Sequence, residues 1–373
     1  MADGRDGRGH VIEQLWYGRE PAAASTRALL WPLAAAFGVT ASARSLLYDL
    51  GILRSRQAPA PVISVGALTT GGSGKTPFVL WLTRRLQQRG LRPCIVTRGY
   101  GGRSRQTHLV TPEHALTETT VAECGDEAAL LAARSGAVVA TSPMRIDACN
   151  AAWERFRPDV FVLDDGFQHR GLARDLDIVL VDGAEKEQRL LPAGPLRERP
   201  SALRRAHVIV TSGGIAPWLR ASAAPEWLLE SRTVATSLVA SLGESAGEPV
   251  ASLAGRRVAA VAAVARPERF VAMLGATGAD VTATILRRDH HPYSAADWHQ
   301  IEQLARSVDR VVTTEKDLVK LAAFAPAVPS WLRALRIDVE VDGEERLLER
   351  AARQLDRSFA PEHHPRSRGG FPE

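Results

Sequence analysis

The sequence predicts an α/β protein whose parallel sheet is covered by helices on both faces. Short apolar runs rich in β-branched residues alternate with helical runs between Val62 and Thr211, and this alternation is typical of parallel sheets. A second, weaker series of the same kind follows Trp227. Because 373 residues are enough for two domains of ordinary size, we expect a larger first α/β domain and a smaller second one.

The first series predicts strands wherever a short apolar run is bounded by polar or turn-forming residues. These strands are expected at Val62–Val65, Cys94–Thr97, Ala137–Thr141, Val160–Leu163, Ile178–Val181 and Val208–Thr211. Runs of helical periodicity between them predict helices at Lys75–Arg89, Asp126–Arg134 and Arg145–Phe156. Ligands of such sheets gather at the carboxyl ends of the strands, and the polar motifs of this chain stand there.

The second series predicts a smaller α/β domain by the same pattern. Its strands are expected at Val258–Val264, Val281–Ile285, Arg310–Thr313 and Leu335–Val341, and its helices at Pro267–Leu274, Ala295–Arg306 and Glu344–Leu355. We therefore divide the chain into residues 1–57 as N-terminal membrane-interface or covering helices, 58–226 as the first domain, 227–357 as the second, and 358–373 as a disordered tail.

The stretch from Val62 to Leu82 predicts a strand, a glycine-rich turn and a helix, in the order that a phosphate-binding loop requires. Backbone N–H groups of such a turn and the positive end of the helix bind phosphate oxygens. The alternative is a glycine turn with an unrelated Gly-Lys-Thr, but the flanking strand and helix favour a nucleoside triphosphate site. The candidate nucleotide-binding residues are Thr69, Thr70, Gly71, Gly72, Ser73, Gly74, Lys75 and Thr76.

The phosphate-loop motif gives specific expectations for three residues of this turn. Thr69 stands where the usual motif has its first glycine. We expect Lys75 to reach the β- and γ-phosphates, and Thr76 to place its hydroxyl on Mg²⁺.

The run Asp159–Gly171, DVFVLDDGFQHRG, places Asp164 and Asp165 directly after a buried strand. A carboxylate at that place beside a phosphate loop binds Mg²⁺, directly or through water. Adjacent carboxylates also repel each other unless a cation lies between them. The alternative is an ordinary Asp-Asp-Gly turn, and the phosphate loop upstream favours the metal interpretation.

Two further segments contain candidate proton-transfer residues. ECGDEAALL places Asp126 and Glu127 at a helix start, where carboxylates either cap the helix or act as a general base toward an attacking hydroxyl. RRDHHPYS places Asp289, His290 and His291 after a strand of the second domain. It is either a solvated turn or the source of an imidazole that supports a carboxylate across a domain cleft. A two-histidine metal site lacks a third ligand nearby.

Two loops rich in arginine are candidate anion sites. Leu190–Pro200, LLPAGPLRERP, carries Arg197 and Glu198 on a backbone stiffened by proline and glycine. RGYGGRSR, residues 98–105, follows a strand. Arginine forks suit phosphate recognition, but a solvated basic loop is equally compatible with both sequences.

The N-terminal part contains an Ala- and Leu-rich stretch, Ala22–Leu53, with an uncharged run from Ala28 to Ala43. That run is shorter than the roughly 20 apolar residues that a spanning helix needs. Arginines and aromatic residues flank it, as they do in helices that lie in a membrane interface. A pair of helices covering one edge of the sheet needs the same single apolar face, so the sequence leaves both interpretations open.

Composition narrows the class of protein. The chain is 45% hydrophobic and 24% charged, as in a soluble globular protein, and its first residues lack the apolar core of a secretory signal. Three cysteines without metal spacing fit a reducing cytosol. The net charge of +5 suggests anionic partners. Because the chain lacks an aromatic-basic platform, we expect no nucleic-acid partner.

Taken together, the motifs resemble one family, the tetraacyldisaccharide 4'-kinases, which phosphorylate the lipid A precursor. In the order of that family, the chain contains VGALTTGGSGKTP, RGYGG, GDE, LDDGFQHRGLARDLDIVLVD, LLPAGPLRE, DHH and TEKD. They cover most of the chain from Val62 to Lys320. Ala67 departs from the family, which often has Asn there, and the phosphate loop itself is intact.

The resemblance implies two α/β/α sandwich domains with the active site in the cleft between them. The first is a P-loop NTPase-like parallel sheet and the second a smaller Rossmann-like domain. ATP and Mg²⁺ are the implied cofactors. The implied reaction transfers the γ-phosphate to the 4'-hydroxyl of a tetraacylated glucosamine disaccharide 1-phosphate. It is expected at the cytoplasmic face of the bacterial inner membrane, whose anionic surface is a second expected partner.

Residue roles follow from the resemblance by motif. Lys75 and Thr76 match the phosphate-loop residues, and Asp126 and His290 match the catalytic aspartate and its partner histidine. Three acidic residues match further active-site positions that we expect, with Thr76, at the metal: Asp164, Asp165 and Glu198. Asp165 is an expected Mg²⁺ contact, and the sequence does not decide which of the two adjacent aspartates lies closer.

A P-loop GTPase or metallochaperone is the main alternative. Such a switch protein needs a guanine-reading motif of the NKxD type. TEKD, at Thr314–Asp317, is a poor imitation of that motif.

Overall fold

The computed structural model describes residues 15–16, 20–185, 188–222, 227–244, 246–325 and 327–359. The strands of its first half are β1 (Val62–Ala67), β2 (Pro93–Thr97), β3 (His108–Val110), β4 (Val138–Thr141), β5 (Val160–Asp164), β6 (Leu176–Asp182) and β7 (Val208–Ser212). The helices of this half are α3 (Lys75–Gln88), α4 (Glu118–Cys124), α5 (Asp126–Ser135), α6 (Arg145–Phe156) and α7 (Pro217–Ser222). Every strand and helix predicted for the first series is present.

The second half repeats the alternation on a smaller scale. Its strands are β8 (Leu228–Val239), β9 (Glu248–Pro249), β10 (Arg257–Ala262), β11 (Asp280–Leu286), β12 (Arg310–Thr314) and β13 (Leu332–Val341). Its helices are α8 (Pro267–Ala276), α9 (Ala295–Ala305), α10 (Glu315–Leu321) and α11 (Glu344–Phe359). The predicted disordered tail begins inside α11, and its part beyond residue 359 lies outside the described residues.

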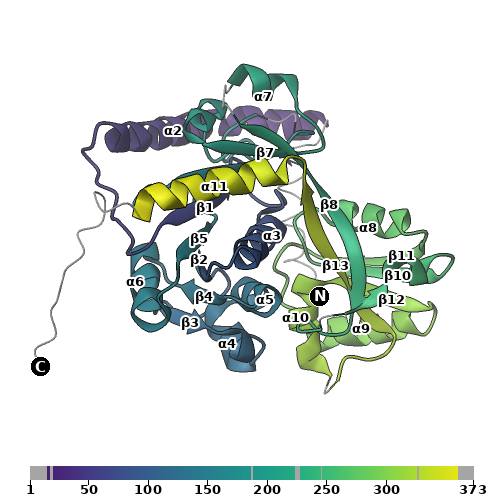
Figure 1. Ribbon diagram of the computed structural model, residues 1–373. Helices are drawn as coiled ribbons and strands as arrows, with labels where there is room; N and C mark the ends of the chain where they lie inside the picture. Colours follow the sequence, from purple (N-terminus) through teal and green to yellow (C-terminus); the bar gives the residue numbers. More distant parts are fainter. Residues whose placement is uncertain are drawn as a thin grey trace, which may run out of the picture.

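The strands form one continuous sheet (Figure 1), in the order β11-β10-β12-β13-β8-β7-β6-β1-β5-β2-β4-β3, with β9 beside β8. The central pairs of each half are parallel. Parallel pairing of β7 with β8 joins the two halves, and β8 pairs antiparallel with β13 on its other side. The predicted α/β fold with a large, mostly parallel sheet is confirmed, whereas the division of the chain into four segments stays a prediction.

Strand β8 was not predicted, although it is the longest strand among the described residues. Its segment Glu230–Thr233 is polar, and only three of its twelve residues are buried. A strand that is buried at so few positions carries no uniform apolar run. Its hydrogen bonds to β7 and β13 hold it in place instead.

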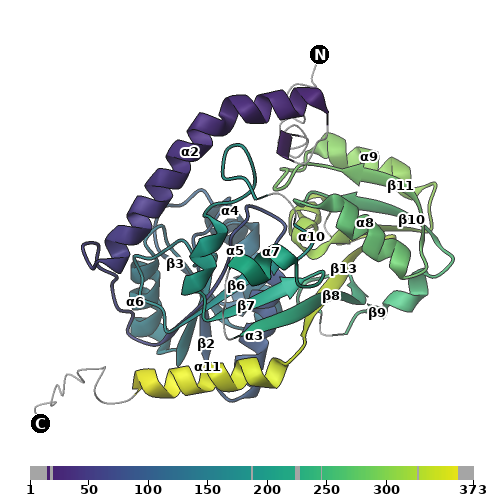
Figure 2. The same ribbon diagram turned by 90° about the horizontal axis from the view of Figure 1, so that it is seen from above.

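Helix α11 of the second half also contributes side chains to the core of the first half. The fully buried Phe78 and Leu82 of α3 belong to the same apolar cluster as Leu347 and Leu355 of α11. Burial of each such side chain contributes about 1.5–3 kcal/mol. Helix α11 therefore returns from the second half and packs on the first, as Figures 1 and 2 show.

The Ala- and Leu-rich N-terminal stretch forms one helix, α2 (Pro21–Asp49), rather than a pair of helices. It runs along the outside of the molecule (Figure 2), and Ala34 and Gly38 are its buried residues. The helix has 29 residues, so it extends beyond the uncharged run and is long and apolar enough to cross a membrane by length and composition alone. Much of its apolar surface is exposed.

Candidate active site

A cavity of about 1120 Å³ opens between the two halves of the molecule. Its lining combines the glycine turn and the end of β5 with the loops after β10 and β11 and the start of α10. Most predicted site residues line it: Thr70, Gly71, Gly72, Ser73, Gly74, Lys75, Thr76, Asp164, Asp165 and His290. The other three, Thr69, Asp126 and Glu198, are not part of the lining.

The glycine turn connects β1 to α3 with a backbone that its glycines permit. Gly72 and Gly74 have φ values of 60° and 74°, in the left-handed region that glycine adopts without steric strain. Gly74 is the N-cap of α3, and the first helical residues line the cavity. Thr69 forms an antiparallel bridge with Leu196, an extended pairing that suits a β-branched residue. The positive end of α3 therefore lies at the cavity.

Lys75 and Thr76 each lie beside an acidic group. Lys75 Nζ donates to Ser73 Oγ at 3.1 Å and lies 3.5 Å from Asp165 Oδ1. Thr76 Oγ1 donates to Glu127 Oε1 at 2.7 Å. A cation and a hydroxyl next to carboxylates at a helix N-terminus are the groups that a metal–nucleotide complex requires.

Asp164, the last residue of β5, is 3% exposed. Burial, together with repulsion from Glu127 and Asp165, raises its pKa to about 8. Thr97 Oγ1 donates to Oδ2 at 3.4 Å, whereas Oδ1 is buried and has no hydrogen-bond partner among the described residues. A divalent cation bound there would give this oxygen a partner and would reduce the repulsion between the neighbouring carboxylates.

Asp165 has a different environment. Burial raises the pKa of Asp165, but the charges of Lys75 and Arg197 outweigh burial and hold this pKa below its ordinary value. Arg197 Nη1 donates to Asp165 Oδ2 at 2.6 Å. In the part of the chain that the structure describes, no group of three or more His, Cys, Asp and Glu side chains could hold a metal ion. Mg²⁺ therefore fits at Thr76 and the aspartates only if phosphate and water oxygens complete its shell.

The raised pKa of Asp164 predicts how stability depends on pH. Between the ordinary carboxyl pKa of about 4 and the folded value of about 8, only the folded chain keeps the proton. Stability therefore falls as pH rises through this window, by up to about 1.4 kcal/mol per pH unit. Asp164→Asn removes this ionisation. In scanning calorimetry without metal, we expect the variant's melting temperature to exceed wild type by a margin that grows from about pH 5 to about pH 8.

The exposed Asp147 of α6 provides the control for that experiment. Asp147→Asn should leave the pH dependence of the melting temperature unchanged. If the difference in melting temperature between Asp164→Asn and wild type stays constant or shrinks as pH rises, the raised pKa of Asp164 is contradicted.

The second half supplies an imidazole beside Asp126, the first residue of α5. His290, with a φ of 60°, lies in the loop after β11. Its Nδ1 lies 3.6 Å from Asp126 Oδ1, and Lys320 Nζ lies 3.7 Å from Oδ2. Burial raises the pKa of Asp126, but His290 and the charges of Lys316 and Lys320 outweigh burial and hold this pKa below its ordinary value. Asp126 is thus an ionised carboxylate at neutral pH, beside a cavity-lining histidine.

The second half also closes over the glycine turn. A Cβ added at Gly72 would lie 2.9 Å from Arg266 Cγ, and one added at Gly71 would lie 3.2 Å from Ala265 Cβ. Arg266 in turn pairs with Asp182 at the end of β6. The loop after β10 therefore packs directly against the glycine turn.

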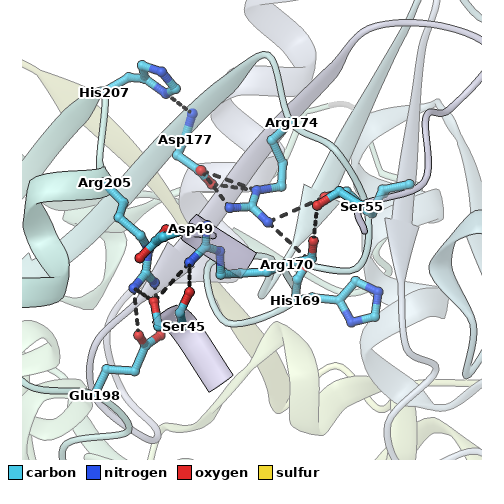
Figure 3. Close-up of polar contacts among 11 residues, drawn as sticks. Ser45, Asp49, Ser55, His169, Arg170, Arg174, Asp177, Glu198, Arg205 and His207 are labelled. Carbon is cyan, nitrogen blue, oxygen red and sulfur yellow. Dashed lines mark hydrogen bonds and ion pairs between the residues drawn. The ribbon is translucent and has the colours of Figure 1, made fainter. Parts of the chain in front are cut away.

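Glu198 lies apart from the other acidic candidates. Its carboxylate pairs with Arg205 at 2.9 Å, and the same guanidinium donates to Ser45 Oγ of α2 at 3.0 Å (Figure 3). Its neighbour Arg197 is the residue that reaches Asp165. The metal contact at Glu198 stays a prediction, and in this structure an arginine compensates the charge of this carboxylate.

Two further charged residues belong to the site: Glu127, which the sequence offered as a possible general base, and Lys316, which was not a sequence candidate. Glu127 accepts from Thr76, and Lys316 Nζ donates to Asp289 Oδ1 at 3.0 Å and lies 3.0 Å from His290 Nε2. Both stand in motifs that the sequence analysis quoted, as the second acid of GDE and the lysine of TEKD. Their roles depend on which residues the two halves bring together.

Comparison with known proteins agrees with this geometry. A sequence model of the family LpxK, described as tetraacyldisaccharide-1-P 4'-kinase, matches residues 26–356. The solved structure of LpxK from Aquifex aeolicus in complex with ATP is similar over 88% of this chain and 99% of that chain, with a TM-score of 0.72 and 31% sequence identity. An ABC transporter substrate-binding protein from Sphaerobacter thermophilus covers 69% of this chain and 55% of its own, at 14% identity. Its TM-score of 0.23 is too low to carry an argument.

The matched residues include the glycine turn, the acidic pair after β5 and the Asp126–His290 pair. The family resemblance predicted from the motifs is confirmed. Because the family model covers most of the sequence, this chain belongs to the tetraacyldisaccharide-1-P 4'-kinase family.

Proposed function

We propose that this protein transfers the γ-phosphate of ATP to the 4'-hydroxyl of a tetraacylated glucosamine disaccharide 1-phosphate. One observation carries the proposal: the glycine turn and His290, which contacts Asp126, line the same cavity although they belong to opposite halves of the sheet. The family name supports the acceptor, and the ATP bound to the Aquifex aeolicus relative supports the donor.

The donor side uses residues of the glycine turn. Backbone N–H groups of the turn and Lys75 would bind the β- and γ-phosphates. Thr76, with Asp164 or Asp165, would hold Mg²⁺, and Mg²⁺, when bound, would neutralise phosphate charge as the leaving oxygen develops it. Arg197 would keep Asp165 ionised and oriented.

The acceptor side must activate a weak nucleophile. Asp126 would accept the proton of the sugar hydroxyl while its oxygen forms a bond to the γ-phosphorus. The bond between the γ-phosphorus and the bridging oxygen breaks, and its electron pair leaves with ADP. A positioned base raises the reaction rate about 10²–10⁴-fold. Fixed charges such as Lys75 raise the rate again, by about 10²–10³-fold. Holding both substrates in one cavity supplies the remaining advantage.

The acyl chains of the acceptor need an apolar surface near the cavity. Arg44 of α2 lines the cavity, and Arg170 of the loop after β5 pairs with Asp49 of α2 at 2.7 Å (Figure 3). Seven large apolar side chains of α2 and the residue after it are exposed: Leu29, Trp31, Leu33, Val39, Leu46, Leu47 and Leu50. A helix held against the protein with an apolar outer surface suits a membrane interface. We infer a peripheral location on the anionic cytoplasmic face of the inner membrane.

Replacing Leu29, Trp31 and Leu33 together by serine tests this interface. Each side chain removes about 1.5–3 kcal/mol of burial in lipid, so we expect the KM for acceptor in vesicles to rise about 10-fold or more. The KM for ATP should change little. Vesicle co-sedimentation and initial rates measure both effects.

Leu116→Ser with Met144→Ser is the matched control, because both residues are exposed and apolar but lie outside α2. This control should behave as wild type. Unchanged vesicle binding and an unchanged KM in the α2 variant would remove the interfacial role.

The reaction itself is tested with ATP labelled at the γ-phosphate and a lipid A disaccharide precursor in mixed micelles. We expect label on the lipid, dependent on Mg²⁺ and faster with ATP than with GTP. Label released only as inorganic phosphate, with a preference for GTP, would support a switch GTPase instead.

A further inference from the structure

Three of the four residues of the segment TEKD, Thr314–Asp317, at the start of α10 make contacts that stabilise the fold. Thr314 Oγ1 accepts from the N–H of Asp317 and caps the helix. Asp317 Oδ2 accepts from Ala263 N at 2.8 Å and is fully buried. Glu315 pairs with Arg336 of β13 at 3.0 Å. These contacts explain every residue of the segment except Lys316, whose side chain lines the cavity.

The ammonium group of Lys316 lies at the outer nitrogen of the His290 ring. Nζ is 3.0 Å from His290 Nε2 and donates to Asp289 Oδ1 at 3.0 Å. Asp289 Oδ1 itself is 3.9 Å from His290 Nε2, which is too far for a hydrogen bond. Lys316 is thus the group that bonds this nitrogen.

That contact determines which ring nitrogen carries the proton. An ammonium group only donates, so Nε2 must accept, and a neutral imidazole then has its proton on Nδ1. Burial lowers the pKa of Lys316, but Asp289, Glu127 and Asp126 outweigh burial and keep this pKa above its ordinary value. The lysine therefore stays charged at neutral pH. The Nδ1–H group faces Asp126 Oδ1 at 3.6 Å.

We infer that Lys316 is a positioning residue that fixes His290 as the Nδ1–H tautomer, so that the ring supports Asp126 and Asp126 alone accepts the proton of the sugar hydroxyl. The mechanistic consequence rests on the proposed phosphoryl transfer; the tautomer does not. With Nε2 bonded to Lys316 and Nδ1 already protonated, the ring has no open nitrogen for that proton.

A purely structural role for Lys316 makes a different prediction. Such a role would tie the loop after β11 to α10, and its loss would lower stability and alter binding of both substrates without choosing a ring nitrogen. The tautomer is therefore the property to measure.

The experiment records nitrogen NMR of the full-length protein labelled at histidine, without substrates, at about pH 8, where an ordinary imidazole is neutral. The His290 resonances are assigned by their loss in His290→Gln. We expect a protonated Nδ1 and an unprotonated Nε2 in wild type. In Lys316→Met the Nε2 atom loses its donor, so we expect the proton to shift measurably from Nδ1 toward Nε2.

Lys320→Met is the matched control, because it removes a lysine that contacts Asp126 from the same helix but does not contact the His290 ring. The tautomer of His290 in this variant should be the same as in wild type. A wild-type proton on Nε2 overturns the inference without any variant, and so does a Lys316→Met spectrum identical to wild type.

Kinetics complete the test. Lys316→Met should lower kcat about 10–100-fold, within the contribution of an oriented base, while the KM for ATP changes less than about twofold. An unchanged kcat would overturn the positioning role. If the expected tautomer is found but wild-type protein transfers no phosphate, the proposed function fails and the tautomer assignment stands.

Discussion

Asp126→Ala is expected to lower kcat about 10²–10⁴-fold, because it removes the group that accepts the proton of the attacking hydroxyl. The carboxylate is ionised at neutral pH, since His290, Lys316 and Lys320 outweigh the effect of burial on its pKa. The glycine turn does not contact Asp126 in any described hydrogen bond or ion pair. ATP affinity should therefore change little, as measured by titration calorimetry beside the label-transfer assay.

The control for this variant is Asp147→Ala, which removes a carboxylate from the first turn of α6. It reproduces the loss of charge at a helix N-terminus without touching the cavity, and it should keep wild-type turnover. Undiminished turnover in Asp126→Ala would remove Asp126 as the base.

Lys75→Met is expected to lower kcat about 10²–10³-fold, because the positive charge that stabilises the transferred phosphoryl group is lost. The same change leaves Arg197, at 2.6 Å, as the remaining cation contact of Asp165 among the described residues. Affinity for ATP should also fall, since Lys75 is expected to contact the β- and γ-phosphates in the ground state. Single-turnover transfer with ATP above its dissociation constant separates the two effects.

Arg85→Met provides the comparison on the same helix. Arg85 pairs with Glu344 of α11 and does not line the cavity, so its loss should leave the single-turnover rate unchanged. Equal rates for Lys75→Met and wild type would mean that the glycine turn does not hold the transferred phosphate.

The elements that the sequence predicted best are those whose burial leaves a local pattern. β1 is buried along its whole length, so its apolar run identifies it without any knowledge of its neighbours. β8 is buried at only three of its twelve positions and lies where the two halves meet. Its position depends on pairing with β7 and β13, and pairing across such distances leaves no periodicity in the strand itself.

The same distinction applies to the site. Lys75 and Thr76 follow from a contiguous motif, because the turn and helix that place them are local. The contact of Lys316 with His290 depends on how α10 packs beside the loop after β11. Glu198 shows the same dependence: its pairing with Arg205 follows from how the fold places these two residues, and its metal contact stays a prediction.

A structure of the protein with a non-hydrolysable ATP analogue and the disaccharide acceptor tests most directly whether donor and acceptor meet in this cavity. The account predicts the terminal phosphate at Lys75 Nζ and the acceptor hydroxyl hydrogen-bonded to Asp126, with both ligands between the two halves. A nucleotide bound away from the glycine turn, or an acceptor hydroxyl separated from Asp126 by protein, would contradict it.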